Sequence, residues 1–259
     1  MRKLFISLLA ASSTASFAVA NNSEFQEFDN QISIGYGMNS TTSEGASAAG
    51  GTIYSSNGSM LNFEGERLFN NGVWVDVNAN MQFGGGPTSV NLGDPYIAPS
   101  YGINGKVGYA FPVLNQHLLL TPYGLVGINN NTNTAVTEDL ATGTPLNSAN
   151  NFYYTGGIGG RLEYRINRAI ELYADQNATY NWDQSQPQFG IAPQNFAAYT
   201  STLGAKFNLA PSFQLGVRGW YTAIQQAAGS NAAPEAIGGG SIPQAVSGYG
   251  GLVSVGLTY

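Results

Sequence analysis

Apolar and polar residues alternate with a period of two along much of the chain. In residues 73–83, VWVDVNANMQF, the apolar positions include Val75 and Val77, while Asp76 and Asn78 fall on the opposite face. A period of two is typical of a β-strand with one apolar and one polar face. The same division recurs in FYYTGGIGGRLEYRI and AYTSTLGAKFNL. The pattern therefore predicts an all-β protein.

Ten segments carry this pattern, and no helical pattern of comparable length competes with them. We predict strands over residues 31–39, 59–69, 72–83, 101–112, 117–128, 152–166, 170–182, 197–209, 212–223 and 248–259.

Short and long connections alternate between the predicted strands. Short turns are expected at Asn70-Asn71, Leu114-Asn115, Asn167-Arg168 and Ala210-Pro211. The other connections span about 40–58, 84–100, 129–151, 183–196 and 224–247. This alternation is typical of outer-membrane barrels, with short periplasmic turns and long extracellular loops, whereas a Greek-key sandwich would not produce it. We predict an antiparallel transmembrane β-barrel of ten strands; eight or twelve stay open, because the connections 40–58 and 224–247 could contain hairpins.

Aromatic residues on the apolar face gather at both ends of the predicted strands. Near the short turns they are Phe69, Tyr109, Phe111, Tyr164, Phe207 and Phe213. Near the long connections they are Phe83, Tyr101, Phe152, Tyr154, Tyr180, Trp182, Tyr199 and Tyr221. Two such girdles are expected where rings lie at the level of the lipid headgroups.

The composition agrees with a surface that faces lipid. Charged residues make up 9% of the chain, against about 25% in an average soluble protein. No stretch after residue 20 has the roughly 18 consecutive apolar residues of a transmembrane helix. There are no cysteines, which excludes disulfides and thiol chemistry.

The N-terminus has the features of a secretory signal peptide. Arg2 and Lys3 precede an apolar run, and Ala18 and Ala20 form a small-residue site, so we expect cleavage after Ala20. We predict a signal peptide over 1–20, a short periplasmic segment over 21–30 and the barrel over 31–259. Without Arg2 and Lys3, seven basic residues remain against 15 acidic ones, a net charge near −8, which argues against nucleic-acid binding.

The last predicted strand ends in a row of apolar residues on one face, formed by Val253, Val255, Leu257 and Tyr259. This row resembles the C-terminal signature of bacterial outer-membrane β-barrel proteins, and the whole pattern is most similar to small OmpA-like and Opa-like barrels. The resemblance implies a bacterial outer-membrane location and contact with membrane lipid and lipopolysaccharide. It also implies that the barrel-assembly machinery reads the row during biogenesis.

The polar face of the predicted strands carries a network of charges that would line the lumen. Its members are Glu64, Glu66, Asp76, Lys106, Arg161, Glu163, Arg165, Glu171, Asp175, Lys206 and Arg218. A hairpin centred on Arg168 would place Arg165 opposite Glu171 and Arg161 opposite Asp175, which are favourable cross-strand pairs.

A turn centred on residue 70 would place two acids, Glu64 and Asp76, opposite each other. We therefore expect a base such as Lys106 to lie between them. Balanced charges in a barrel of this size would fill the interior, since wide channels use about sixteen strands; alternatively they would line a narrow path for ions.

Enzymatic chemistry is not indicated. The single histidine, His117, follows a short turn and would lie at the periplasmic end, whereas histidine-dependent proteases and lipid hydrolases of this barrel class act at the outer rim. We expect no enzyme activity, no cofactor and no metal site; the loop acids Glu138 and Asp139 are interpreted as solvated.

Two functions remain after these exclusions. The first is a structural or surface-exposed role, in envelope integrity, adhesion or interaction, through extracellular loops whose ligand the sequence does not identify. The alternative is a narrow porin-like channel for passive diffusion of ions or small solutes. The predicted outer loops carry acids and no base, at Glu44, Asp94, Glu138, Asp139, Asp183 and Glu235, so contact with lipopolysaccharide would use bridging cations.

Overall fold

The computed structural model describes residues 23–45, 53–83, 100–113, 117–133, 149–183, 195–226 and 243–259. The predicted signal peptide with Ala18 and Ala20, the turn at Leu114-Asn115, and Asp94, Glu138, Asp139 and Glu235 lie outside the described residues.

One helix and eleven strands make up the described chain. The helix is α2 (Ser23–Asp29). The strands are β1 (Gln31–Gly45), β2 (Ile53–Leu68), β3 (Val73–Phe83), β4 (Ser100–Tyr109), β5 (Phe111–Val113), β6 (Leu118–Asn133), β7 (Ala149–Arg165), β8 (Ile170–Asp183), β9 (Phe196–Ala210), β10 (Phe213–Gln226) and β11 (Pro243–Thr258). Among the described residues, no helix is both long and apolar enough to cross a membrane.

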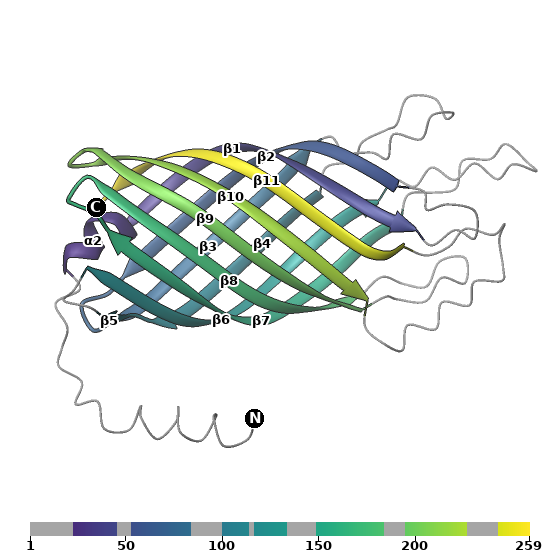
Figure 1. The fold of residues 1–259 in the computed structure, drawn as a ribbon, viewed down its shortest axis with the longest axis horizontal. Helices are drawn as coiled ribbons and strands as arrows, with labels where there is room; N and C mark the ends of the chain where they lie inside the picture. Colours follow the sequence, from purple (N-terminus) through teal and green to yellow (C-terminus); the bar gives the residue numbers. More distant parts are fainter. Residues whose placement is uncertain are drawn as a thin grey trace, which may run out of the picture.

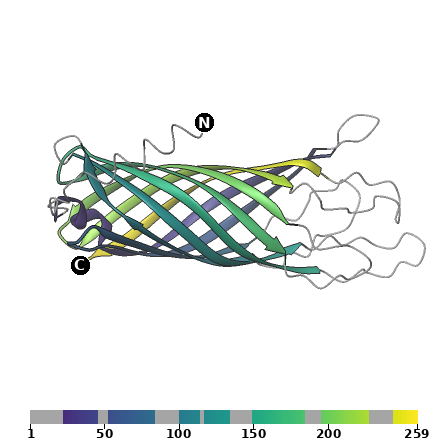
Figure 2. The same cartoon turned by 90° about the horizontal axis from the view of Figure 1, so that it is seen from below.

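The strands form one closed antiparallel sheet. β1 pairs with both β2 and β11. β4 and β5, which flank Ala110, both pair with β6, so they occupy one place in the wall. The result is the predicted ten-stranded barrel, a cylinder of tilted strands (Figures 1 and 2). The described parts of the connections 40–58 and 224–247 are extensions of β1, β2, β10 and β11 and contain no extra hairpin.

The two ends of the barrel differ. α2, the C-terminus and the short connections at 69–72, 166–169 and 211–212 lie at one end (Figure 1). We call this the turn end, and the opposite one the loop end. Helix α2, which precedes the first strand, and the C-terminus, which follows the last, therefore lie at the same end of the barrel.

The hairpin of β2 and β3 differs from its predicted register. Glu66, not Glu64, lies opposite Asp76, and Glu64 lies opposite Asn78. The connection is closed by Gly72, whose φ of 87° is a backbone conformation that favours glycine. This moves the centre of the hairpin from residue 70 to residue 71. The pairing changes by two residues, so every side chain keeps its predicted face.

The outer surface is apolar around the middle of the barrel. Val126, Ile158 and Leu203, each near the centre of its strand, are 70%, 72% and 68% exposed. Exposed aromatic side chains lie toward both strand ends: Phe69, Tyr109, Phe111, Tyr164 and Phe213 at the turn end, and Phe83, Tyr101, Tyr154, Trp182, Tyr199 and Tyr221 at the loop end. A continuous apolar belt of this kind is unusual for a soluble monomer and fits a lipid environment.

Candidate functional site

Helix α2 closes the turn end of the barrel. Its Phe25 and Phe28 are fully buried, although the helix has only seven residues. Phe25 packs in a cluster that includes Leu68, Trp74 and Leu119 from the barrel wall. We call Ser23–Asp29 the plug. Aromatic side chains three residues apart would share one face of a helix, a signal that the prediction of a short periplasmic segment over 21–30 did not use.

Arg161 lies at the centre of a buried group of charges beneath the plug. Its Nη1 is 2.9 Å from Glu66 Oε1, and its Nε is 2.6 Å from Glu163 Oε1. Its Nη2 is 3.9 Å from Oδ1 of Asp29, the last residue of the plug. The guanidinium also lies over the ring of Tyr173, 4.4 Å from its centroid, in a cation–π contact.

Lys206 is the second cation of this group. Its Nζ is 2.6 Å from Asp29 Oδ1, 2.8 Å from Glu66 Oε2 and 3.5 Å from Glu171 Oε1. It also donates a hydrogen bond to the backbone oxygen of Phe28, at 3.3 Å. We define the ion cluster as Asp29, Glu66, Arg161, Glu163, Glu171 and Lys206, all of which are buried.

The acids of the ion cluster differ in the number of hydrogen-bond donors around them. Glu66 accepts hydrogen bonds from Trp74 Nε1 at 2.8 Å and from Gln31 Nε2 at 3.0 Å, besides its two ion pairs. Burial raises the pKa of Asp29 above its ordinary value, and the positive charge of Lys206 opposes this shift. Glu66 thus accepts hydrogen bonds from more donors than the other acids of the cluster do.

The predicted register of the hairpin around Arg168 is confirmed. The two arginines that face acids across this hairpin nevertheless form their ion pairs with other residues. Arg165 lies opposite Glu171 and Arg161 lies opposite Asp175. Among the described residues, however, the side chain of Arg165 pairs with Glu24 of the plug. Arg161 pairs within the ion cluster. Long side chains reach across a narrow lumen, so strand neighbours are not their only available partners.

A second layer of charges lies on the loop side of the ion cluster. Lys106 Nζ is 3.1 Å from Asp76 and 3.5 Å from Asp175. Glu64 Oε2 is 2.7 Å from Nη1 of Arg218, which comes from β10. The expected cation beside Asp76 is thus Lys106, but Glu64 has a separate partner, Arg218, from a strand three places away in the wall.

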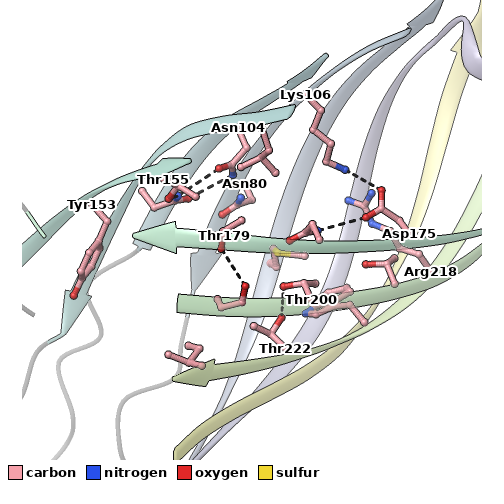
Figure 3. A pocket seen from close by; sticks show the side chains of 18 of the residues that line it. Asn80, Asn104, Lys106, Tyr153, Thr155, Asp175, Thr179, Thr200, Arg218 and Thr222 are labelled. Carbon is pink, nitrogen blue, oxygen red and sulfur yellow. Dashed lines mark hydrogen bonds and ion pairs between the residues drawn. The ribbon is translucent and has the colours of Figure 1, made fainter. Parts of the chain in front are cut away.

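A cavity of about 430 Å³ lies in the lumen, and Arg161 and the second-layer residues Lys106, Asp175 and Arg218 are among those that line it. We call it the vestibule. Figure 3 shows amide and hydroxyl side chains from several strands pointing into it. Asn129 donates a hydrogen bond to Thr155 at 2.9 Å, and the hydroxyls of Thr200 and Thr222 are 3.0 Å apart. The vestibule can therefore hold a small polar solute.

The remaining predicted positions lie on the outside or at the rim. Val253, Val255, Leu257 and Tyr259 point outward and are exposed. His117 is exposed at the turn end, where its backbone oxygen accepts a hydrogen bond from the Arg165 N–H. It is not among the residues that line the vestibule.

An apolar belt around a charged interior reverses the arrangement of a soluble protein, and closure leaves no free sheet edge. The chain has the architecture of an outer-membrane β-barrel.

Similar solved structures include the outer-membrane protease OmpT from Escherichia coli, at 10% identity and a TM-score of 0.45 over 89% of this chain and 97% of that one. The β domain of the Bordetella autotransporter BrkA is similar at 12% identity and a TM-score of 0.47, over 89% and 100% of the two chains. The attachment invasion locus protein Ail of Yersinia pestis is similar at 15% identity and a TM-score of 0.35, over 88% and 97%.

No protein-family model matches the barrel sequence, and no curated protein sequence matches it.

Proposed function

We propose that this barrel is a surface protein of a bacterial outer membrane and acts through its loop end, with a lumen that does not conduct. The observation that carries the proposal is the burial of the plug and the ion cluster inside the turn end of the barrel. We further propose that the chain is exported with a signal peptide cleaved after Ala20, and that the barrel-assembly machinery reads the row ending in Tyr259. The turn end would face the periplasm and the loop end the outside.

Two physical features support a closed lumen. The side chains of Phe25, Leu68, Trp74 and Leu119 belong to one apolar layer in which each is at most 1% exposed, and Phe28 of the same helix is also fully buried. An ion crossing this layer would lose its hydration without gaining polar partners, which is strongly unfavourable. The lumenal charges beneath this layer already form ion pairs with one another. They are therefore not available as counter-charges for a permeating ion.

The vestibule favours one alternative function, a narrow channel that opens when the plug moves. Its polar lining and volume of about 430 Å³ are suited to a hydrated ion or a small solute. Conduction would then require that Phe25 and Phe28 leave the barrel. A closed lumen thus requires that the plug stays in the barrel, whereas a channel requires that it leaves.

Single-channel recording in planar bilayers separates these functions. The refolded mature chain, residues 21–259, should produce no stable current steps, and different gel mobility of boiled and unboiled samples would verify its fold. The double variant F25D/F28D should conduct, because it places charge in the apolar layer and displaces the plug. The matched control is Glu27→Ala, on the exposed side of the same helix, which should stay silent. Reproducible steps from the folded mature chain would instead establish the channel.

The proposed orientation has its own test. A peptide epitope inserted in the connection 84–99 should bind antibody on intact cells, whereas one inserted between Ala210 and Pro211 should bind only after the outer membrane is permeabilised. Binding in the opposite order would refute the orientation, independently of conduction.

A further inference from the structure

Three carboxylates meet where the plug touches the barrel wall. They belong to Asp29 of α2, Glu163 of β7 and Glu171 of β8, and each offers a ligand oxygen within 4.8 Å of the others. All three residues are fully buried, at 0% exposure. Glu163 and Glu171 are diagonal neighbours across the hairpin of β7 and β8. Like charges in such positions repel each other, so this arrangement needs a compensating partner.

The charges of the ion cluster do not balance. When all four of its acids are ionised they face two bases, Arg161 and Lys206, which is a formal charge of minus two. Arg165 does not make up the difference, because it is paired with Glu24. Uncompensated charges in a buried site are strongly destabilising. The cluster therefore lacks a charge of plus two.

The oxygens of the three acids are also short of partners. Oδ2 of Asp29 and both carboxylate oxygens of Glu163 and Glu171 are buried and accept no hydrogen bond from the protein. Oε1 of Glu163 and Oε1 of Glu171 do lie in ion pairs with Arg161 and Lys206. Three oxygens, one from each acid, remain without a cation among the described residues. Buried polar atoms in this state call for a partner such as an ordered water or a bound ion.

We propose that Asp29, Glu163 and Glu171 bind one Ca²⁺ ion. Their ligand atoms are all oxygens, which hard cations prefer. Ca²⁺ accepts about six to eight oxygen ligands in flexible geometry, so the three oxygens that pair with no base can bind it directly and water can complete the coordination. Mg²⁺ fits less well, since it demands near-octahedral geometry and usually keeps several waters. A single divalent ion also supplies the missing charge of plus two.

Bound Ca²⁺ would fasten the plug to the wall. Asp29 ends α2, whereas Glu163 and Glu171 belong to adjacent strands, so one ion would join three elements. Retention of the plug would then depend on the concentration of free Ca²⁺. This binding does not require a closed lumen, so the proposed function and the metal site stand or fall separately.

Metal analysis of the full mature chain tests the site directly. Protein refolded without lipopolysaccharide is stripped with EDTA, dialysed against buffered Ca²⁺, and assayed for calcium by mass spectrometry. We expect one Ca²⁺ per chain. Glu163→Gln and Glu171→Gln should weaken binding by at least about tenfold, the lower bound found for loss of metal-site partners. Glu64→Gln is the matched control, because Glu64 pairs with Arg218 and is not one of the three proposed ligands. This variant should bind calcium like the parent.

Thermal unfolding gives a second measurement, which does not rely on the calcium assay. EDTA should lower the melting temperature of the parent and of Glu64→Gln, and it should leave the melting temperature of Glu171→Gln unchanged. If Glu171→Gln does not fold, Asp29→Asn and Glu163→Gln provide the same comparison. Absence of bound calcium at millimolar Ca²⁺, equal binding by parent and triad variants, or a preference for Mg²⁺ over Ca²⁺ would each overturn the proposal.

Discussion

Replacement of Arg161 by methionine should destabilise the barrel more than replacement of any other lumenal base that faces the vestibule. Arg161 contacts three acids, Asp29, Glu66 and Glu163, and it is 3% exposed. Methionine keeps most of the length of the side chain but carries no charge and no donor. The substitution therefore removes the central cation and leaves its acids in place.

The expected loss follows from burial of the acids that remain. Removal of one partner from a buried ion pair typically costs about 3–5 kcal/mol, because the other charge is left uncompensated. In Arg161→Met the excess of negative charge in the ion cluster rises from two to three. Arg218→Met breaks a pair with Glu64 whose side chains are 18% and 10% exposed. Partial access to water should limit that loss to about 1 kcal/mol.

Urea unfolding in lipid vesicles, followed by tryptophan fluorescence, measures both variants against the parent. Trp74 lies beside Arg161, 5.5 Å from ring centroid to guanidinium carbon, and reports on this region. Arg161→Lys should recover part of the loss, since it restores one positive charge without the planar set of donors. A loss below about 1 kcal/mol for Arg161→Met, or one no larger than for Arg218→Met, would refute the reasoning, because it falls below the range for buried pairs.

The same unfolding assay tests two further predictions. Gly204→Ala would place a Cβ atom 2.4 Å from the ring of Tyr173, so it should cost about 1–3 kcal/mol by overpacking, whereas Gly105→Ala has open space and should be neutral; equal effects would contradict this assignment. Ile158→Arg, near the middle of the apolar belt, should cost about 2–4 kcal/mol, and Ile166→Arg at the turn end about 0–1 kcal/mol. Equal losses at these two positions would argue against a lipid-facing belt.

Local patterns in the sequence were sufficient for the strands and for most of the pairing. The hairpin around Arg168 was predicted in the observed register because a short turn and a period of two fix both faces and the pairing. The hairpin of β2 and β3 was placed two residues out, because the position of the turn depends on the backbone of Gly72 and not on the alternation of residues.

The loop-end limits of the strands were less predictable. β1 continues to Gly45 and β2 begins at Ile53, beyond the predicted limits at 39 and 59. Segments such as Ser40–Gly45 are polar and carry little strand preference of their own. They are extended because neighbouring strands of the closed barrel supply hydrogen-bond partners along their length.

The sequence by itself determined the fold class and the face to which each lumenal charge belongs, because a strand alternates its side chains whatever surrounds it, whereas closure of the sheet settled the number of strands at ten. Only the tertiary structure decided which charges meet. Closure of the sheet brings Arg161 of β7 to Glu66 of β2, and insertion of the plug brings Asp29 to Arg161 and Lys206. A period of two assigns a side chain to the lumen, but its partners are chosen by the width of the barrel and by the position of α2 within it. The excess of negative charge, and with it the proposed calcium site, arises at that level alone.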